Sequence, residues 1–153
     1  MNSKKDFSIR KAKEKDVDVL ADLLKELFSI EKDFCVNRKK QIKGLRAFIL
    51  DSSKGEIFVI EVSNTVVGMC SLQFLISTAE GGIVAFVEDM IIAKEWRRKK
   101  LGSKFIKYVL KYAKEKQSLR VQLLADINNL PALEFYKSMF FKKTDLICLR
   151  KKL

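Results

Sequence analysis

Residues 87–103, VEDMIIAKEWRRKKLGS, decide the fold because an apolar run passes here into a basic loop that contains a glycine. Together with the residues before it, the run predicts a long strand over 83–93 that only two acidic residues interrupt. Apolar residues then recur at helical spacing over 102–116. The first N–H groups of a helix lack intrahelical partners and lie at its positive end. The stretch therefore predicts either an anion site over 97–103 or an ordinary basic loop.

The positive charge of the chain is concentrated beside this loop. Of 153 residues 31 are basic and 19 are acidic, and +8 of the net +12 lies within residues 94–116. That charge alone fits a nucleic acid, an anionic membrane surface or an anionic cofactor. Few exposed-looking aromatic residues are interleaved with the basic ones, although readers of single strands and RNA use such rings for stacking. A nucleic acid is therefore the less favoured partner.

The spacing of apolar residues predicts the remaining elements on both sides of this stretch. Strands are expected over 7–12, 56–62, 66–76, 119–125 and 143–150, and helices after Asp16, over 38–50 and over 129–139. The order is then β-α-α-β-β-β-α-β-α-β. With 48% apolar residues in a chain of this length, it predicts a single domain over residues 1–153, an α/β sandwich with a mixed sheet.

The absence of histidine narrows the possible chemistry. It excludes zinc sites that contain histidine and Ser-His triads, so proton carriers must be Glu, Asp, Tyr, Cys, Lys or water. The three cysteines, Cys35, Cys70 and Cys148, are far apart and lie among apolar neighbours, where a thiol packs as a small hydrophobe. We therefore expect no metal and no catalytic cysteine.

The N-terminus and the length of the apolar runs bear on localisation. Residues 1–6, MNSKKD, precede a charged strand and not the apolar core of a signal peptide. The longest apolar runs are only a handful of residues, too short to span a membrane. We therefore expect a cytoplasmic protein that does not bind a membrane.

Two motifs resemble those of the GNAT superfamily of N-acetyltransferases. In the first, the pyrophosphate-binding pattern R/Q-x-x-G-x-G/A that follows an apolar strand, Arg97 matches the first position and Gly102 the last. The second, Asn-x-x-Ala followed by an aromatic or aliphatic residue and Tyr, is matched by Asn129, Ala132, Phe135 and Tyr136. The similarity runs from about Phe7 to the end of the chain. Two motifs in the family's order and separation make the resemblance specific.

The resemblance implies a fold, a co-substrate and residues that bind it. The fold would be a GNAT-like three-layer sandwich, a mixed and mostly antiparallel sheet flanked by helices. Acetyl-CoA would be the co-substrate, with its pantetheine arm hydrogen-bonded along Met90, Ile91 and Ile92 and supported by Asn129. Tyr136 would lie near the sulfur and protonate the departing thiolate. The pyrophosphate would bind the backbone amides of Arg97, Arg98, Lys99, Lys100, Leu101, Gly102 and Ser103.

The sequence departs from the family pattern at two positions. Lys100 stands where the first glycine of the loop is usual, which predicts a loop that is less tightly folded there. Phe140 stands where a glycine usually ends the helix that carries Tyr136. Because an aromatic residue does not readily take the left-handed conformation of a helix C-cap, we expect that helix to end differently.

Glu88 and Asp89 are the candidate proton acceptors. An alkylamine is protonated at neutral pH, so its transfer reaction needs a base within reach. Neighbouring residues of a strand point to opposite faces, so only one of the two is expected to face the cleft. Similarity to small-amine acetyltransferases with a Glu-Asp pair favours Glu88, acting through water. The alternatives are Asp89 as the base, or a buried carboxylate with a purely structural role.

The resulting hypothesis is direct acetyl transfer from acetyl-CoA to a primary amine. A GNAT-like sensor that binds the cofactor without turnover and a basic nucleic-acid-binding module are the alternatives. The acceptor is not readable from the fold, since GNAT acceptors range from small amines and antibiotics to amino acids and proteins. Glu31, Asp33 and Glu80 hint at a cationic acceptor. A homodimer is a further possibility.

Overall fold

The protein is described here by a computed structural model that covers residues 7–31 and 33–153. Residues 1–6, on which part of the expected localisation rests, lie outside the described residues. The chain forms two compact units, whose boundary in the sequence falls between Gln122 and Leu123, and each is described separately below. Among the described residues, no helix combines the length and the apolar character needed to cross a membrane.

The first unit is built on a sheet with the strand order β1-β2-β3-β4-β5. The pairs β1–β2, β2–β3 and β3–β4 are antiparallel. Before β5, Leu119 N–H donates to Ile83 O and Ala85 N–H donates to Arg120 O, and the order of these bonds along both segments is that of a parallel pair. The predicted mixed, mostly antiparallel sheet is therefore confirmed. The elements are β1 (Phe7–Lys11), η1 (Glu14–Asp16), α1 (Val17–Ile30), α2 (Arg38–Leu50), β2 (Gly55–Val62), β3 (Thr65–Ser77), β4 (Gly82–Ile92), η2 (Lys94–Trp96), α3 (Leu101–Glu115) and β5 (Val121–Leu123).

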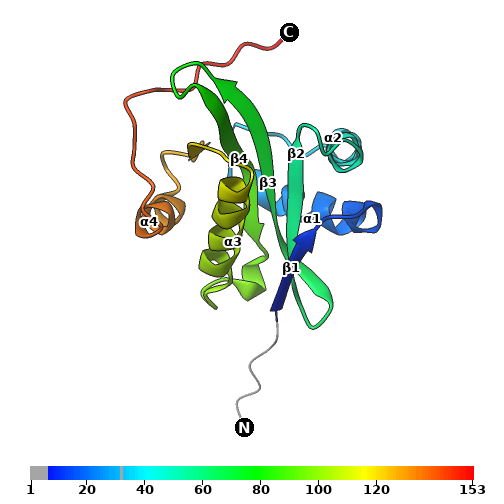
Figure 1. Ribbon diagram of the computed structural model, residues 1–153. Coiled ribbons are helices and arrows are strands. Elements are labelled where there is room, and N and C mark those ends of the chain that lie inside the picture. The colour runs from blue at the N-terminus through cyan, green and yellow to red at the C-terminus, as the bar shows by residue number, and fades with distance from the viewer. Residues whose placement is uncertain (1–6, 32) are drawn as a thin grey trace. The chain divides into compact units, whose positions relative to one another are not determined.

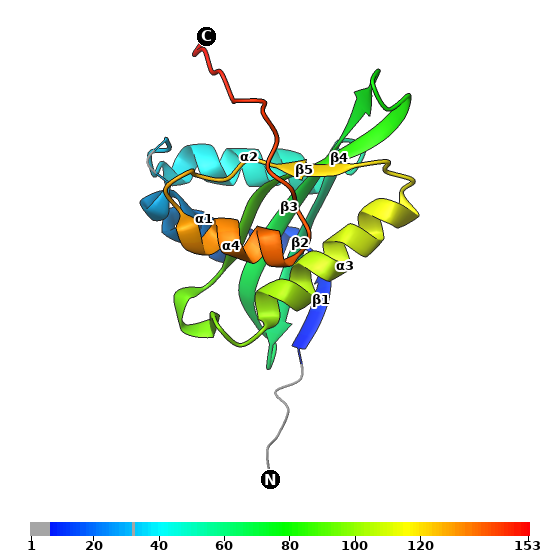
Figure 2. The same cartoon turned by 90° about the vertical axis from the view of Figure 1, so that its left-hand side faces the viewer.

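Helices cover both faces of this sheet. Figures 1 and 2 show α3 on one side and α1 with α2 on the other. The alternation of side chains along β2 explains the arrangement, because Ile57 and Val59 join the apolar cluster of α1 and α2. Phe58, between them, meets the rings of Tyr108 and Tyr112 on α3 at 5.6 and 4.8 Å. The three-layer arrangement implied by the resemblance is confirmed in this unit.

An ion-pair network fixes the start of α1 to the sheet edge. Arg10 of β1 donates to both carboxylate oxygens of Asp16, at 2.7 and 2.9 Å, and to Glu61 of β2 at 2.6 Å. Asp16 also accepts from Lys13 N–H at 2.7 Å, and it does not cap α1 with its side chain. The Arg10 guanidinium holds the pKa of Asp16 below its usual value. Asp16 thus joins β1 to α1, where the sequence predicted a simple helix cap.

The second unit contains α4 (Leu130–Ser138). Its start follows the prediction, since Asn129 Oδ1 accepts from Ala132 N–H at 3.2 Å and Pro131 lies in the first turn. Its end contradicts the prediction. Phe140 takes the left-handed conformation with φ 67°, the one that the sequence analysis considered too costly for an aromatic residue.

Two backbone hydrogen bonds account for this helix end. Phe141 N–H donates to Tyr136 O at 3.0 Å and Phe140 N–H donates to Lys137 O at 3.0 Å, the pattern of a Schellman motif. The rings of Tyr136 and Phe141 meet at 5.6 Å and add the apolar contact that often accompanies this motif. These interactions hold Phe140 in the conformation that a glycine would take at lower cost.

Two predicted strands differ from the structure. Residues 143–150 form no strand, so the predicted closing strand is wrong for this structure, and β5 is shorter than the predicted 119–125. A strand is defined by hydrogen bonds to a neighbouring strand as well as by its side-chain pattern. The pattern of apolar residues over 143–150 could not show whether such a neighbour is present.

Replacing Phe140 with glycine should stabilise the end of α4. A left-handed non-glycine residue costs roughly 1–2 kcal/mol, part of which the flexibility of an unfolded glycine offsets, so the net gain should be about 0.5–1 kcal/mol. Phe140 is 91% exposed, so little packing is lost. Hydrogen exchange of the amides of residues 134–139 should slow by about two- to fivefold. Lys143→Gly, at an exposed position without positive φ, is the control. Faster exchange in Phe140→Gly than in the native chain would contradict this account.

Candidate functional site

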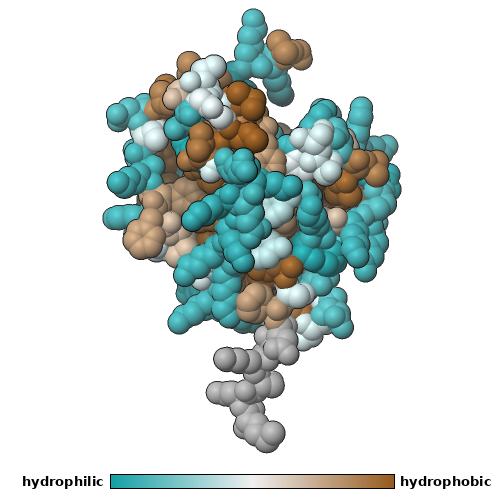
Figure 3. All heavy atoms as spheres, viewed as in Figure 1, coloured by the Kyte–Doolittle hydropathy of each residue, from teal (hydrophilic) through white to brown (hydrophobic). Residues whose placement is uncertain are grey.

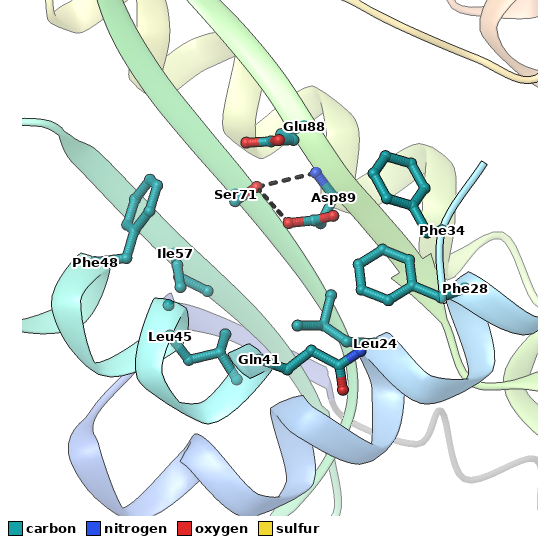
Figure 4. A pocket seen from close by; sticks show the side chains of 11 residues that line it. Leu24, Phe28, Phe34, Gln41, Leu45, Phe48, Ile57, Ser71, Glu88 and Asp89 are labelled. Carbon is teal, nitrogen blue, oxygen red and sulfur yellow. Dashed lines mark hydrogen bonds between the residues drawn. The ribbon is translucent and has the colours of Figure 1, made fainter. Parts of the chain in front are cut away.

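A bulge in β4 brings the two candidate carboxylates together. Cys70 of β3 pairs with Met90 and Leu72 pairs with Val87, so Ser71 alone faces both Glu88 and Asp89. Asp89 N–H donates to Ser71 Oγ at 2.9 Å, and the Ser71 hydroxyl lies 3.4 Å from Asp89 Oδ2 (Figure 4). Both carboxylates line one cavity. The prediction that they face opposite sides of the sheet is therefore wrong, because strict alternation does not hold through a bulge.

The two carboxylates differ in their surroundings. Burial, and after it the negative charges of Glu88 and Glu31, together raise the pKa of Asp89 to about 7, against a smaller opposing effect of the Ser71 hydrogen bond. Glu88 is exposed and accepts a hydrogen bond from Gln73 Nε2 at 2.6 Å. Asp89 is therefore the carboxyl that changes its protonation near neutral pH.

The cavity beside them is small and mostly apolar. Its volume is about 230 Å³. Figure 4 shows Phe28 and Phe34 on one side of the Ser71–Asp89 pair and Phe48 on the other. No lysine or arginine of the described residues lines it. The lining comprises Leu24 and Phe28 of α1, Phe34, Gln41, Gly44, Leu45 and Phe48 of α2 and the segment before it, Ile57 of β2, Ser71 of β3, and Glu88 and Asp89 of β4.

The loop between β4 and α3 presents a row of unused backbone donors. Arg98 and Lys100 both have φ 59°, so the chain turns sharply through the left-handed region twice within three residues. Within the described residues, the N–H groups of residues 98–103 donate to no backbone or side-chain acceptor of the protein. Such a turn at a helix N-terminus forms a concave site for an anion. Lys100 takes the left-handed conformation that the family's glycine would allow, so the predicted looser fold is wrong.

Side chains of the same loop hold its position. Arg97 Nε donates to Ile92 O at 2.8 Å, and the Arg97 guanidinium pairs with Glu26 of α1. The Ser103 hydroxyl donates to Lys100 O at 2.9 Å. Arg97 thus ties the loop to the end of β4 and to α1. Its predicted contact with pyrophosphate stays a prediction and would involve the backbone more readily than the guanidinium.

Basic side chains surround these donors. Arg98, Lys99 and Lys100 are exposed, and Lys99 Nζ lies 4.5 Å from the centre of the Trp96 ring and donates to Glu95 O at 2.8 Å. Along α3 the lysines form an exposed stripe, while Phe105 and Val109 are buried against the sheet. Figure 3 shows hydrophilic side chains gathered over the face that α3 presents. The candidate anion site therefore lies in a strongly positive surface.

The end of β4 offers an open edge next to this loop. On one side Met90, Ile91 and Ile92 pair with Cys70, Met69 and Gly68 of β3. Within residues 7–31 and 33–122, no strand pairs with the other edge at 90–92, because the segment before β5 bonds to β4 at Ile83 and Ala85. An extended ligand could hydrogen-bond there as an added strand, as the resemblance implies.

The remaining predicted site residues belong to the second unit. Asn129 is the N-cap of α4, and its side-chain oxygen is engaged by Ala132 N–H. Tyr136 lies within α4, with its ring between those of Phe135 and Phe141 at 5.2 and 5.6 Å. Their roles toward a cofactor stay predictions. Among the described residues, no group of acidic residues or cysteines is arranged to hold a metal.

Sequence reasoning did not identify the residues that shape the cavity. Ser71 is a buried polar residue between Cys70 and Leu72, and only its pairing with the bulge gives it a role. Phe48 of α2 packs against the apolar cluster, as the helical spacing of apolar residues over 38–50 indicates, and it also contributes to the cavity wall. Gln41 gave one signal that could have been used, because it lies one turn before Leu45 on the inner face of α2.

The stability of the protein should fall as pH rises between about 4 and 7 because of Asp89. Its pKa is about 7 in the native protein against 3.8 ordinarily, so in this window the native state holds a proton that the unfolded state has lost. Asp89→Asn removes the cost of ionising a buried carboxyl. The free energy of unfolding of the variant minus that of the wild-type protein should therefore rise with pH, by on the order of 1–4 kcal/mol between pH 4 and 8. Urea unfolding at both pH values measures it. Glu95→Gln, an exposed carboxyl, is the control. A pH-independent difference would contradict the assignment.

Comparison with known proteins places this geometry in a family. The chain matches the model of the Acetyltransferase (GNAT) family over residues 19–141. An uncharacterised N-acetyltransferase of Methanocaldococcus jannaschii is 24% identical over 94% of this chain, which spans 64% of that relative's length. An uncharacterised N-acetyltransferase of Archaeoglobus fulgidus is 24% identical over 91% of this chain and 95% of its own.

Solved structures share the fold. A possible acetyltransferase from Clostridium difficile 630 superposes with a TM-score of 0.86 at 22% identity, covering 96% of this chain and 97% of its own. A predicted acetyltransferase from Clostridium acetobutylicum, solved with acetyl-CoA, has a TM-score of 0.77 at 18% identity and covers 95% and 96%. With the family model spanning most of its length, the chain belongs to the GNAT acetyltransferase family.

Proposed function

We propose that the protein transfers the acetyl group of acetyl-CoA to a primary amine by direct attack of the amine on the thioester. The observation that carries the proposal is Asp89, a carboxyl held by a strand bulge at the wall of the cavity, with a pKa of about 7. A base with such a pKa is half deprotonated at neutral pH and can accept the proton of an ammonium group. The same strand leads directly to the loop of unused amides.

The donor side fits the chemistry of a CoA thioester. The amides of residues 98–103 and the exposed side chains of Arg98 and Lys100 match a pyrophosphate, which is dianionic and accepts several hydrogen bonds. The open edge at residues 90–92 matches the amide groups of pantetheine, and Asn129 is the further residue that the family resemblance assigns to it. The acetyl-CoA in the Clostridium acetobutylicum structure supports the same co-substrate. Bound there, acetyl-CoA supplies an activated acyl carbon.

We assign the base to Asp89, where the sequence favoured Glu88. Asp89 is the more buried of the two, and Ser71 fixes its orientation by two contacts. Glu88 contributes its negative charge, which raises the pKa of Asp89. Asp89 would take the amine proton directly or through one water. Glu88 as the base is the alternative that the variants below distinguish.

Acetyl transfer forms one bond, breaks one bond and moves one proton at each end. The amine nitrogen forms a bond to the acetyl carbon, the carbon–sulfur bond breaks, and the excess proton of the amine passes to Asp89. The departing thiolate takes up a proton, for which Tyr136 is the donor implied by the family resemblance. The products are an N-acetylated amine and free CoA. No metal or redox partner enters this balance.

The carboxyl variants should separate the two candidate bases. With an amine that the native enzyme acetylates, Asp89→Asn should lower kcat by roughly 10²-fold or more at pH 7, the contribution typical of one general base. Glu88→Gln should lower it by less than about tenfold. The kcat of the wild-type enzyme should rise with pH through about 7, and the kcat of Asp89→Asn should not show this rise. Release of free thiol measures the rate.

The opposite effects of the two substitutions would identify Glu88 as the base. A large loss in Glu88→Gln with a near-native Asp89→Asn would return the base to Glu88. Acetyl-CoA binding without turnover of any amine would favour the sensor alternative.

Tyr136→Phe, which keeps the ring and removes the hydroxyl, should lower kcat without restoration at high pH. A Tyr136→Phe variant with native kcat would remove Tyr136 from the mechanism.

A further inference from the structure

The aromatic side chains of the cavity are arranged to hold a flat apolar group. The rings of Phe28 and Phe34 stack at 5.1 Å with an interplanar angle of 30°. Phe48 reaches the cavity from α2 on the other side, and Leu24, Leu45 and Ile57 complete the apolar surface (Figure 4). An aromatic ring or a branched alkyl group buries its surface there favourably, whereas a polyhydroxylated sugar would lose hydrogen bonds to water.

The charged residues at the cavity indicate the charge of the ligand that it would bind. Glu88 and Asp89 line it, and Glu31 lies close enough to act on the charge of Asp89. Within the described lining there is no basic side chain to balance a ligand carboxylate. A ligand with an amine is therefore favoured at the Asp89 end, and one that carries a carboxylate is repelled.

Gln41 adds a second polar feature, away from the carboxylates. Both atoms of its side-chain amide are shielded from solvent, and neither has a hydrogen-bond partner among the described residues. In Figure 4 the amide lies beside Leu24, on the side of the cavity away from Ser71 and Glu88. Shielded amides are usually satisfied, so an unmet one in a cavity wall points to a ligand group. A hydrogen bond from this amide to a ligand in the cavity requires a change of the Gln41 rotamer, a kind of change that is common at binding interfaces.

We propose that the acceptor is a small primary amine whose aromatic or branched apolar body carries, at its far end, an uncharged hydrogen-bonding group such as a carboxamide or a hydroxyl. The amine would meet Asp89, the body would lie between Phe48 and the Phe28–Phe34 pair, and the far group would bond to Gln41. A cavity of about 230 Å³ is below the roughly 300–1,000 Å³ of drug-sized sites, so the acceptor is small. This inference rests on the proposed function.

A matched series of arylalkylamines tests the proposal. 2-Phenylethylamine, tyramine, 4-(2-aminoethyl)benzamide and 4-(2-aminoethyl)benzoate share one amine and one ring and differ only in the para group. With acetyl-CoA and thiol release as the readout, the benzamide and tyramine should have KM values at least tenfold below that of 2-phenylethylamine. The benzoate should be the poorest of the four. Glucosamine and spermidine should be acetylated at least a hundredfold less efficiently than the benzamide.

Gln41→Met isolates the role of the amide, because it keeps the length of the side chain and removes the polar atoms. Its melting temperature should rise, since an unsatisfied buried amide is lost. Its KM for the benzamide should rise about tenfold, while its KM for 2-phenylethylamine should stay native. Gln122→Met, the same change at an exposed position of β5, should alter neither quantity. An unchanged preference for the benzamide in Gln41→Met would overturn the role of Gln41.

The outcomes distinguish this inference from the proposed function. Acetylation of glucosamine or spermidine in preference to all four arylalkylamines would overturn the inference and leave the acetyltransferase function intact. If the protein acetylates none of the amines tested, the proposed acetyltransferase function is wrong. Calorimetric titration with the four arylalkylamines alone, without acetyl-CoA, then still tests the inference about the cavity. Affinity that decreases from the benzamide through 2-phenylethylamine to the benzoate would support the inference. Equal affinity for all four amines, or no binding of any, would overturn it.

Discussion

The bulge opposite Ser71 is the constraint on which the rest of the site depends. It places Glu88 and Asp89 at one cavity, although alternation along a regular strand would separate them. Ser71 occupies both the N–H and the carboxylate of Asp89, so the buried carboxyl has a fixed orientation. Burial and two neighbouring charges then bring its pKa to about 7. A local irregularity in hydrogen bonding thus produces a group that can exchange protons at neutral pH.

The same strand also leads to the loop that we propose binds the acetyl donor. Beyond the bulge, Ile91 anchors β4 in the cluster of α1 and α2, and the chain leaves the sheet at Ile92. Arg97 bonds back to Ile92 and pairs with Glu26, so the loop has a defined position before its amides turn outward. The left-handed conformations of Arg98 and Lys100 carry a steric cost that these anchors offset. Strain at this loop is consistent with a built binding site.

The sequence predicted the long, strongly periodic elements and missed what depends on pairing. The strand over 83–93 and the helix over 102–116 follow from apolar spacing alone. The bulge requires knowledge that Ser71 is the partner of Glu88 and Asp89, which no local pattern contains. Phe140 was misjudged because bonds to Tyr136 and Lys137 override its intrinsic preference. The position of Gln41 on the inner face of α2 is readable from the sequence, but only the structure shows that its shielded amide has no hydrogen-bond partner among the described residues.

The central claim is that one strand and the loop after it bind the acetyl donor. Titration of isotopically labelled protein with acetyl-CoA, followed by amide NMR, tests it most directly. The amides of residues 98–103, which donate to no acceptor within the described protein, should shift strongly, together with those of 90–92. Acetyl-pantetheine, which lacks the pyrophosphate, should shift only the second group. Shifts confined to other parts of the chain, or the same shifts with both ligands, would contradict the account.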